Sequence, residues 1–146
     1  MKKAILIVLA FCVISIGLTW FWNEWARAHY ADFLKAVAPS IYELIGFGDA
    51  RVGAHRERYI NFVPFVSLLL VTPGLTLRRR TIGLVLGLLS IFVGHLALNL
   101  TELLQPGNSL PIVPSIISDT LPFLVWIIVA YPALKKFLPV ADDPSP

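Results

Sequence analysis

The chain has 146 residues, of which 57% are hydrophobic and 14% charged, and its formal net charge is +3. Soluble domains average about 45–50% apolar residues, so this composition excludes an ordinary soluble domain, and the length leaves room for one domain only. Seven of the twelve basic residues form short clusters beside apolar runs, at positions 2–3, 78–80 and 135–136. Such clusters fix membrane topology and touch anionic lipid headgroups, which argues against nucleic-acid binding.

The first apolar run, residues 4–22, follows two lysines and predicts a transmembrane helix. Aromatic residues of the kind that mark a membrane interface end this run: Trp20, Phe21, Trp22 and Trp25. Ala26-Arg27-Ala28 fits the small-x-small cleavage site of a signal peptide. A cleaved leader followed by three spans therefore stays open as an alternative.

Residues 23–58 form the one sizeable polar segment, with five basic and five acidic residues. Apolar residues recur at the helical period over residues 30–45: Tyr30, Phe33, Leu34, Val37, Ile41, Leu44 and Ile45. This pattern predicts an amphipathic helix that lies on the membrane surface or caps the bundle. We expect Pro39 to kink or split the helix, and Gly46-Phe47-Gly48 to end it.

Three further apolar runs predict spanning helices at about residues 59–76, 82–101 and 113–134. The first of them contains Pro64, and we expect a break at its outer end. The turn at Arg78-Arg79-Arg80 precedes the second, and the loop over residues 105–111 separates the second from the third. The proline-rich tail, residues 139–146, is expected to fray.

The basic clusters indicate the orientation of the chain. All three lie on one side of the membrane if the chain crosses it four times, which places both termini in the cytoplasm. The polar segment at residues 23–58 and the loop at residues 102–112 then face outward. We therefore expect an all-α fold, a single membrane domain of four transmembrane helices with one amphipathic outer helix.

Six polar residues gather near the outer ends of the expected spans: Arg58, Asn61, His95, Asn99, Glu102 and Asp119. His95, Asn99 and Glu102 lie at i, i+4 and i+7, on one helical face. Polar groups are costly inside a bilayer, so each needs a reason. A hydrogen-bond network that pins the helices is the more common use, and a water-accessible site for binding, proton transfer or chemistry is the alternative.

Small residues form a second face of the helix at residues 82–101, about 110–120° from the His95 face. They are Gly83, Gly87, Ser90 and Gly94. Glycine four residues from glycine lets helix backbones approach closely. The face predicts either packing inside the chain or a seam with a second copy or a partner protein.

Two features of the sequence resemble catalytic patterns, and neither is complete. Gly46-Phe47-Gly48-Asp49 matches the GxGD string of intramembrane aspartyl proteases, but their chemistry needs a second intramembrane aspartate, and none precedes it. A Cys–His pair would need Cys12 beside His95, whereas the expected spans place Cys12 near mid-bilayer and His95 further out. No spacing predicts a metal or cofactor site, so the sequence favours a protein that is not an enzyme.

Residues 58–73 (RYINFVPFVSLLLVTP), the arginine turn and the helix through Leu100 carry a resemblance over about a third of the chain. They resemble the small membrane proteins that accompany bacterial exosortases, particularly the exosortase H-associated type, and loosely the exosortase/archaeosortase core. In those enzymes a Cys, an Arg and a His form the transpeptidase site, with the Arg three residues after an Asn. Here Glu102 follows Asn99 at that spacing, and the second span has no cysteine.

The resemblance therefore implies a non-catalytic companion of a protein-sorting or envelope-export system. We expect an accessory protein of the bacterial inner membrane that contacts the lipid bilayer and binds a membrane-protein partner or a second copy of itself, without nucleic acid, metal or cofactor. The alternative is a small membrane enzyme or transporter that uses His95, Asn99, Glu102 and Asp119.

Overall fold

The computed structural model describes residues 2–50, 52, 61–104 and 112–135, and only the backbone of residues 101–104, 112–115 and 117–118. These residues form helices joined by short turns, with no strand among them, which confirms the predicted all-α class. The order along the chain is α1 (Lys2–Phe21), a π-helical turn η1 (Trp22–Ala26), α2 (Arg27–Leu44), α3 (Phe62–Val71), α4 (Leu77–Leu104) and α5 (Ile112–Leu134). The predicted fraying tail, residues 139–146, and the first two residues of the predicted span at 59–76 lie outside the described residues.

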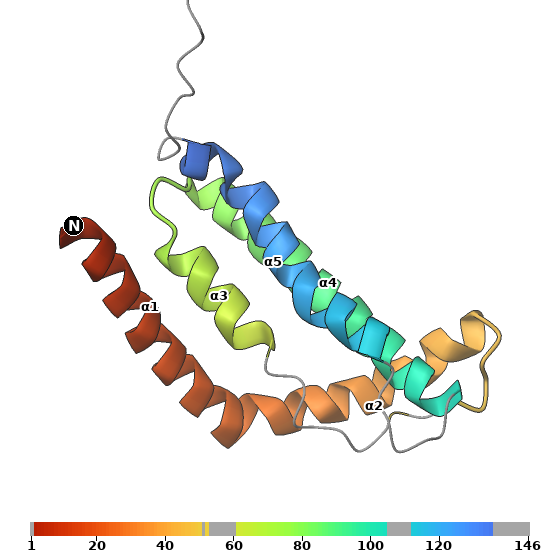
Figure 1. The fold of residues 1–146 in the computed structure, drawn as a ribbon. Coiled ribbons are helices and arrows are strands. Elements are labelled where there is room, and N and C mark those ends of the chain that lie inside the picture. The colour runs from red at the N-terminus through yellow and green to blue at the C-terminus, as the bar shows by residue number, and fades with distance from the viewer. Residues whose placement is uncertain (1, 51, 53–60, 105–111, 136–146) are drawn as a thin grey trace, which may run out of the picture.

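The first apolar run and the amphipathic segment form one continuous helical path rather than two separate helices. No glycine or proline lies between Gly17 and Pro39, so nothing local stops the helix after Trp22. The path instead passes through η1 and bends there, so that α2 points away from the line of α1 (Figure 1). A π-helical turn is a recognised cause of such a bend, and here it places Trp22 in the core.

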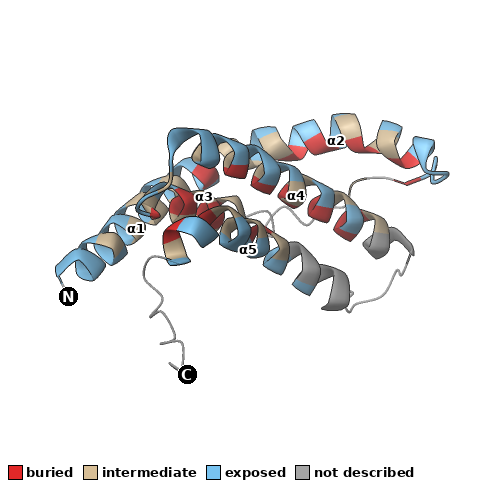
Figure 2. Ribbon diagram, turned by 90° about the horizontal axis from the view of Figure 1, so that it is seen from above, coloured by how far each residue is buried: buried red, intermediate tan, exposed pale blue. Residues whose placement is uncertain are grey.

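The side of α2 that packs on the protein is rotated from the predicted apolar face. Its buried residues are Ala31, Leu34, Ala38 and Tyr42, and this stripe faces α4 (Figure 2). Phe33 and Leu44, which the pattern placed at the centre of the apolar face, are 50% and 86% exposed. Apolar residues therefore extend around more of the circumference of α2 than the part that is buried against the rest of the protein.

The predicted end of α2 is confirmed, and the predicted split at Pro39 is wrong. Pro39 lies inside the helix, which continues because the loss of one backbone hydrogen bond is offset by burial of Ala38 and Tyr42 on the same stripe. Gly46 has a φ of +89°, and its N–H donates to the Glu43 carbonyl while the Phe47 N–H donates to the Tyr42 carbonyl. This pair of bonds is a Schellman motif, which requires the left-handed residue that glycine supplies.

Helix α3 is short, at ten residues. Pro64 lies in its first turn, where a missing N–H costs nothing, and the helix stops at Thr72 because Pro73 forces an extended backbone before it (ψ 114°). Gly74, with a φ of +75°, then turns the chain into α4. Ten residues rise roughly 15 Å, about half of a bilayer's 30 Å hydrocarbon core, so the described part of the predicted span at residues 59–76 does not cross a membrane alone.

Helices α4 and α5 run antiparallel, and α3 packs beside them (Figure 1). A Cβ on Gly87 would overlap the ring of Phe65 from α3, and one on Gly83 would lie 2.8 Å from Val129 of α5. Gly94 is buried, and the Ser90 hydroxyl donates to the Gly87 carbonyl at 2.8 Å. At Gly83 and Gly87 the small-residue face is thus filled by this chain's own side chains.

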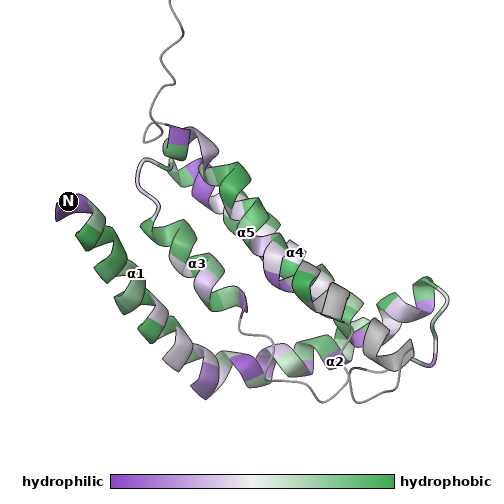
Figure 3. Cartoon of the chain, in the orientation of Figure 1, coloured by the Kyte–Doolittle hydropathy of each residue, from purple (hydrophilic) through white to green (hydrophobic). Residues whose placement is uncertain are grey.

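Within the described part of the chain, two helical stretches are long and apolar enough to cross a membrane: Lys2–Leu44, through its first part, and Leu77–Leu100. The chain carries apolar colour along α1, α3, α4 and α5, whereas α2 is mixed (Figure 3). Helix α1 buries no residue at all. Its large side chains are open to the surroundings, as are many on α4 and α5, among them Val13, Ile16, Leu89, Val93 and Ile128.

We expect Gly87→Ala to destabilise the protein by about 1–3 kcal/mol, because the added methyl group would overfill the space that the Phe65 ring occupies. Thermal unfolding in detergent measures the effect. Gly17→Ala is the matched control, since no atom lies within 4 Å of the added Cβ. Equal unfolding temperatures for the two variants would contradict the packing of α3 against α4.

Candidate functional site

The contact between α2 and α4 is built around His95, whose side chain is fully buried. Its Nδ1 lies 2.8 Å from the hydroxyl oxygen of Tyr30, 65 residues earlier in the chain. When the imidazole carries its proton on Nε2, Nδ1 accepts the hydrogen bond and the phenol donates. Tyr30 thereby gives a buried polar ring a partner on another helix.

Aromatic rings enclose this hydrogen bond. Phe62, at the start of α3, meets both Tyr30 and His95 edge-on, with ring centroids 4.9 and 5.6 Å apart. Trp22 of η1 lies 5.1 Å from Phe62 and 5.9 Å from Tyr30. We call these four residues, Trp22, Tyr30, Phe62 and His95, the aromatic cluster. It brings η1, α2, α3 and α4 together at one point.

A second tyrosine, Tyr42, bonds the C-terminal part of α2 to α4. The hydroxyl of Tyr42, a residue only 1% exposed, donates to the Leu96 carbonyl at 2.9 Å. Asn99, also buried, donates from Nδ2 to the His95 carbonyl at 2.7 Å. The hydroxyls of Tyr30 and Tyr42 thus link two positions of α2, about three turns apart, to α4, while the Asn99 amide bonds within α4 itself.

The six predicted polar residues divide in the structure. His95 and Asn99 lie under α2, whereas Asn61 and Asp119 contact each other at the exposed start of α3, with Nδ2 of the amide donating to Oδ1 of the carboxylate at 2.8 Å. Arg58 and the side chain of Glu102 lie outside the described residues. Periodicity put His95 and Asn99 on one face correctly, but it could not show that this face meets a tyrosine of the amphipathic helix.

A third polar contact, at the turn before α4, was not expected from the sequence. Thr72 is 4% exposed, and its Oγ1 donates to the Leu68 carbonyl at 2.6 Å and accepts from Nε1 of Trp126 at 2.9 Å. Arg80 donates from Nη2 to the Thr72 carbonyl at 3.0 Å. The sequence feature that could have revealed this contact is Trp126, because an indole N–H inside an apolar helix needs a hydrogen-bond acceptor.

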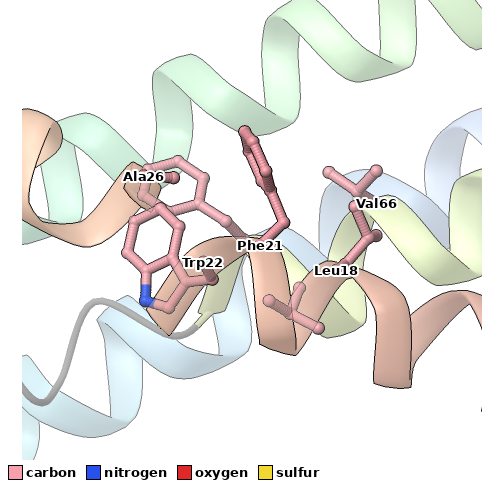
Figure 4. A pocket seen from close by; sticks show the side chains of 7 residues that line it. Leu18, Phe21, Trp22, Ala26 and Val66 are labelled. Atoms are coloured by element: carbon pink, nitrogen blue, oxygen red, sulfur yellow. The ribbon is translucent and has the colours of Figure 1, made fainter. Parts of the chain in front are cut away.

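An open apolar groove of about 210 Å³ lies beside the aromatic cluster (Figure 4). Leu18, Phe21 and Trp22 form one wall, and Phe62 and Val66 of α3 form part of the other. Its walls offer water no hydrogen-bond partner, so only an apolar group fits its chemistry.

The described polar groups do not assemble a catalytic arrangement. Cys12 is exposed on α1, while His95 is enclosed by aromatic rings, so the two do not form a nucleophile–base pair. Among the described residues no group of three His, Cys, Asp or Glu side chains could hold a metal ion. What the geometry does supply is a set of interhelical hydrogen bonds in apolar surroundings.

We expect Tyr30→Phe and His95→Leu each to lower stability by about 1–3 kcal/mol, because each removes the hydrogen bond between these two buried groups. The double variant should lose less than the sum of the two, with a coupling of about 1 kcal/mol, as measured by a double-mutant cycle of unfolding in detergent. Asn61→Ala, in the separate Asn61–Asp119 pair, is the control and should add independently to Tyr30→Phe. Full additivity of Tyr30→Phe and His95→Leu would contradict the contact.

No family model matches this chain, and neither a curated protein nor a solved structure matches it.

Proposed function

We propose that this chain is a non-enzymatic accessory protein of the bacterial inner membrane. One observation carries the proposal. Large apolar side chains are exposed along α1, α4 and α5, while the described buried polar residues Ser67, Thr72, His95 and Asn99 each make a hydrogen bond within the chain. Exposed apolar area of this extent is rare on soluble monomers and suits contact with lipid or with other membrane helices. In this arrangement α1, α4 and α5 cross the bilayer, α3 is a shorter fourth segment within it, and α2 lies at the outer surface.

The distribution of charge supports a cytoplasmic location for both termini. Lys2 and Lys3 begin α1, the three arginines begin α4 and Lys135 follows α5, and these ends lie on the same side of the molecule (Figures 1 and 2). A Cβ on Gly74, in the turn before α4, would lie 3.7 Å from Ala133 near the end of α5. Basic residues concentrated at one end of a helical bundle mark its cytoplasmic side.

The accessory role draws support from α1. One side of this helix packs on α3, and no residue of it is buried. At Gly83 and Gly87 the small-residue face of α4 is filled by Val129 and Phe65, so a partner cannot pack there. We assign the contact with a membrane-protein partner or a second copy to the apolar face of α1.

We further propose that the partner is an exosortase-type protein. The residues that carry this resemblance, 58–73 and the arginine turn, include a described unit: α3 ends at Thr72, and Arg80 of α4 bonds to its carbonyl. The chain has one cysteine, exposed on α1 away from His95, which suits a companion better than a transpeptidase.

The topology is tested with reporter fusions in a bacterial host. Alkaline phosphatase, which is active outside the cytoplasm, should be inactive when fused after Lys136 and active when inserted in the loop at residues 102–112. A green fluorescent protein fused at the same points should give the reverse pattern. A periplasmic C-terminus would contradict the four-segment arrangement.

The role is tested by deleting the gene and following the processing of a sorted protein in the same cells. We expect processing to slow or stop, and the protein to copurify with the sortase. Cys12→Ala should restore processing fully, because an accessory protein needs no nucleophile here. Val13→Lys, which puts a charge on the exposed face of α1, should fail to restore it; loss of function in Cys12→Ala would instead indicate an enzyme.

A further inference from the structure

The guanidinium of Arg80 is held at the turn between α3 and α4 with donors to spare. Nη2 donates to the Thr72 carbonyl, and Nε is buried without a hydrogen-bond partner among the described residues. A guanidinium carries five N–H donors in a planar fork that matches the oxygens of a phosphate or carboxylate. Nε faces the interior, so the terminal amino groups, whose donors the single bond to Thr72 does not exhaust, are the part of the fork suited to an added anion.

The position of Arg80 is fixed by its neighbours. Thr72, whose carbonyl it bonds, is itself held by Trp126 of α5 through its hydroxyl. Three helices therefore determine where the guanidinium lies. A side chain held in this way loses little further freedom when it binds a ligand.

Other cations surround this point. Arg78 and Arg79 are exposed in the first turn of α4, where the helix dipole adds positive potential. Gly83 lies opposite Val129 in the antiparallel pair, so Lys135, six residues further along α5, is level with Leu77, six residues earlier on α4. We call Arg78, Arg79, Arg80 and Lys135 the basic end.

The described acidic residues lie elsewhere. Asp119, the described acid of α5, is sixteen residues from Lys135, or about 24 Å along the helix. The others, Glu24, Asp32, Glu43 and Asp49, lie in η1, in α2 and directly after it. The basic end therefore keeps its charge unneutralised within the described part of the chain.

Apolar side chains directly border the cations. Leu77 is 81% exposed beside Arg78, and Ile82 and Tyr131 are exposed one turn below. A ligand with both an anionic group and a hydrocarbon chain would satisfy both parts of this surface. A soluble anion would leave the apolar part uncovered.

We propose that the basic end binds the phosphate of an anionic phospholipid, with Arg80 as the fixed donor and Arg78, Arg79 and Lys135 around it. The acyl chains then lie along the exposed apolar faces of α4 and α5. This inference rests on the membrane location proposed above, and it adds a headgroup site to it.

The full chain, purified in neutral detergent, is titrated with phosphatidylglycerol or with phosphatidylcholine of the same acyl chains, and bound lipid is counted by native mass spectrometry. We expect phosphatidylglycerol to bind at least about tenfold more tightly, and Lys135→Gln or Arg78→Gln to weaken it about fivefold each, the usual effect of one cation near a charged lipid surface. Lys35→Gln, which removes an exposed cation of α2 from a loose pair with Asp32, should change nothing.

Arg80→Gln should have the largest effect, but it also removes the bond to Thr72, so the two exposed cations keep the test independent of folding. Equal affinity for the two lipids, or an equal loss in Lys35→Gln, would overturn the proposal. Displacement of phosphatidylglycerol by millimolar inorganic phosphate would also overturn it and indicate a site for a soluble anion. Lipid selection in micelles does not depend on which side of the membrane the termini occupy, so the fusion experiment can fail while this one succeeds.

Discussion

The close approach of α3 and α5 to the glycine face of α4 is the constraint on which the rest of the structure depends. Phe65 occupies the space that a side chain at position 87 would need, and Val129 does the same at position 83. A helix as short as α3 is not stable alone. Packing against α4 therefore both stabilises α3 and fixes its position. Once α3 is fixed, Phe62 at its start lies beside Trp22, and α1 packs along α3.

Helix α4 divides its circumference among three environments. Glycines on one arc meet α3 and α5, and about 110–120° away the His95 side chain meets Tyr30 of α2, while the backbone carbonyl of Leu96 accepts from Tyr42. The remaining arc carries the exposed apolar residues, which include Val85, Leu89 and Val93. One helix therefore supplies the tight packing, the polar docking and the apolar outer surface, each with the residue type that its environment requires.

The parts of this fold that could be predicted are those that local sequence decides. The apolar runs gave α5 to within one residue and the apolar part of α4, which begins five residues earlier and ends three later than predicted. Gly46 ends α2 and Pro73 stops α3 because helix termination depends on nearby residues. The π-helical turn at Trp22–Ala26 could not be predicted in this way, since it is favoured by the burial of Trp22 against Phe62 from a distant part of the chain.

The candidate site was predictable only in part for the same reason. Helical spacing placed His95 and Asn99 on one buried face, but their neighbours depend on how α2 is rotated. Alanines, not the larger apolar residues, fill half of the buried stripe of α2. Hydrophobicity ranks Phe33 and Leu44 above Ala31 and Ala38, so a pattern of apolar residues alone selects the wrong side of the helix.

The aromatic cluster links the two parts of the molecule that the proposed function assigns to different tasks. Trp22 ends the path of α1 and lies against Tyr30 and Phe62, while the hydroxyl of Tyr30 reaches His95 on α4. The direction of α1 and the docking of α2 are therefore set by the same side chains. A partner that tilted α1 would have to move Trp22, and through it the contact between Tyr30 and His95. The aromatic cluster is therefore the point at which the direction of α1 and the position of α2 on α4 are joined.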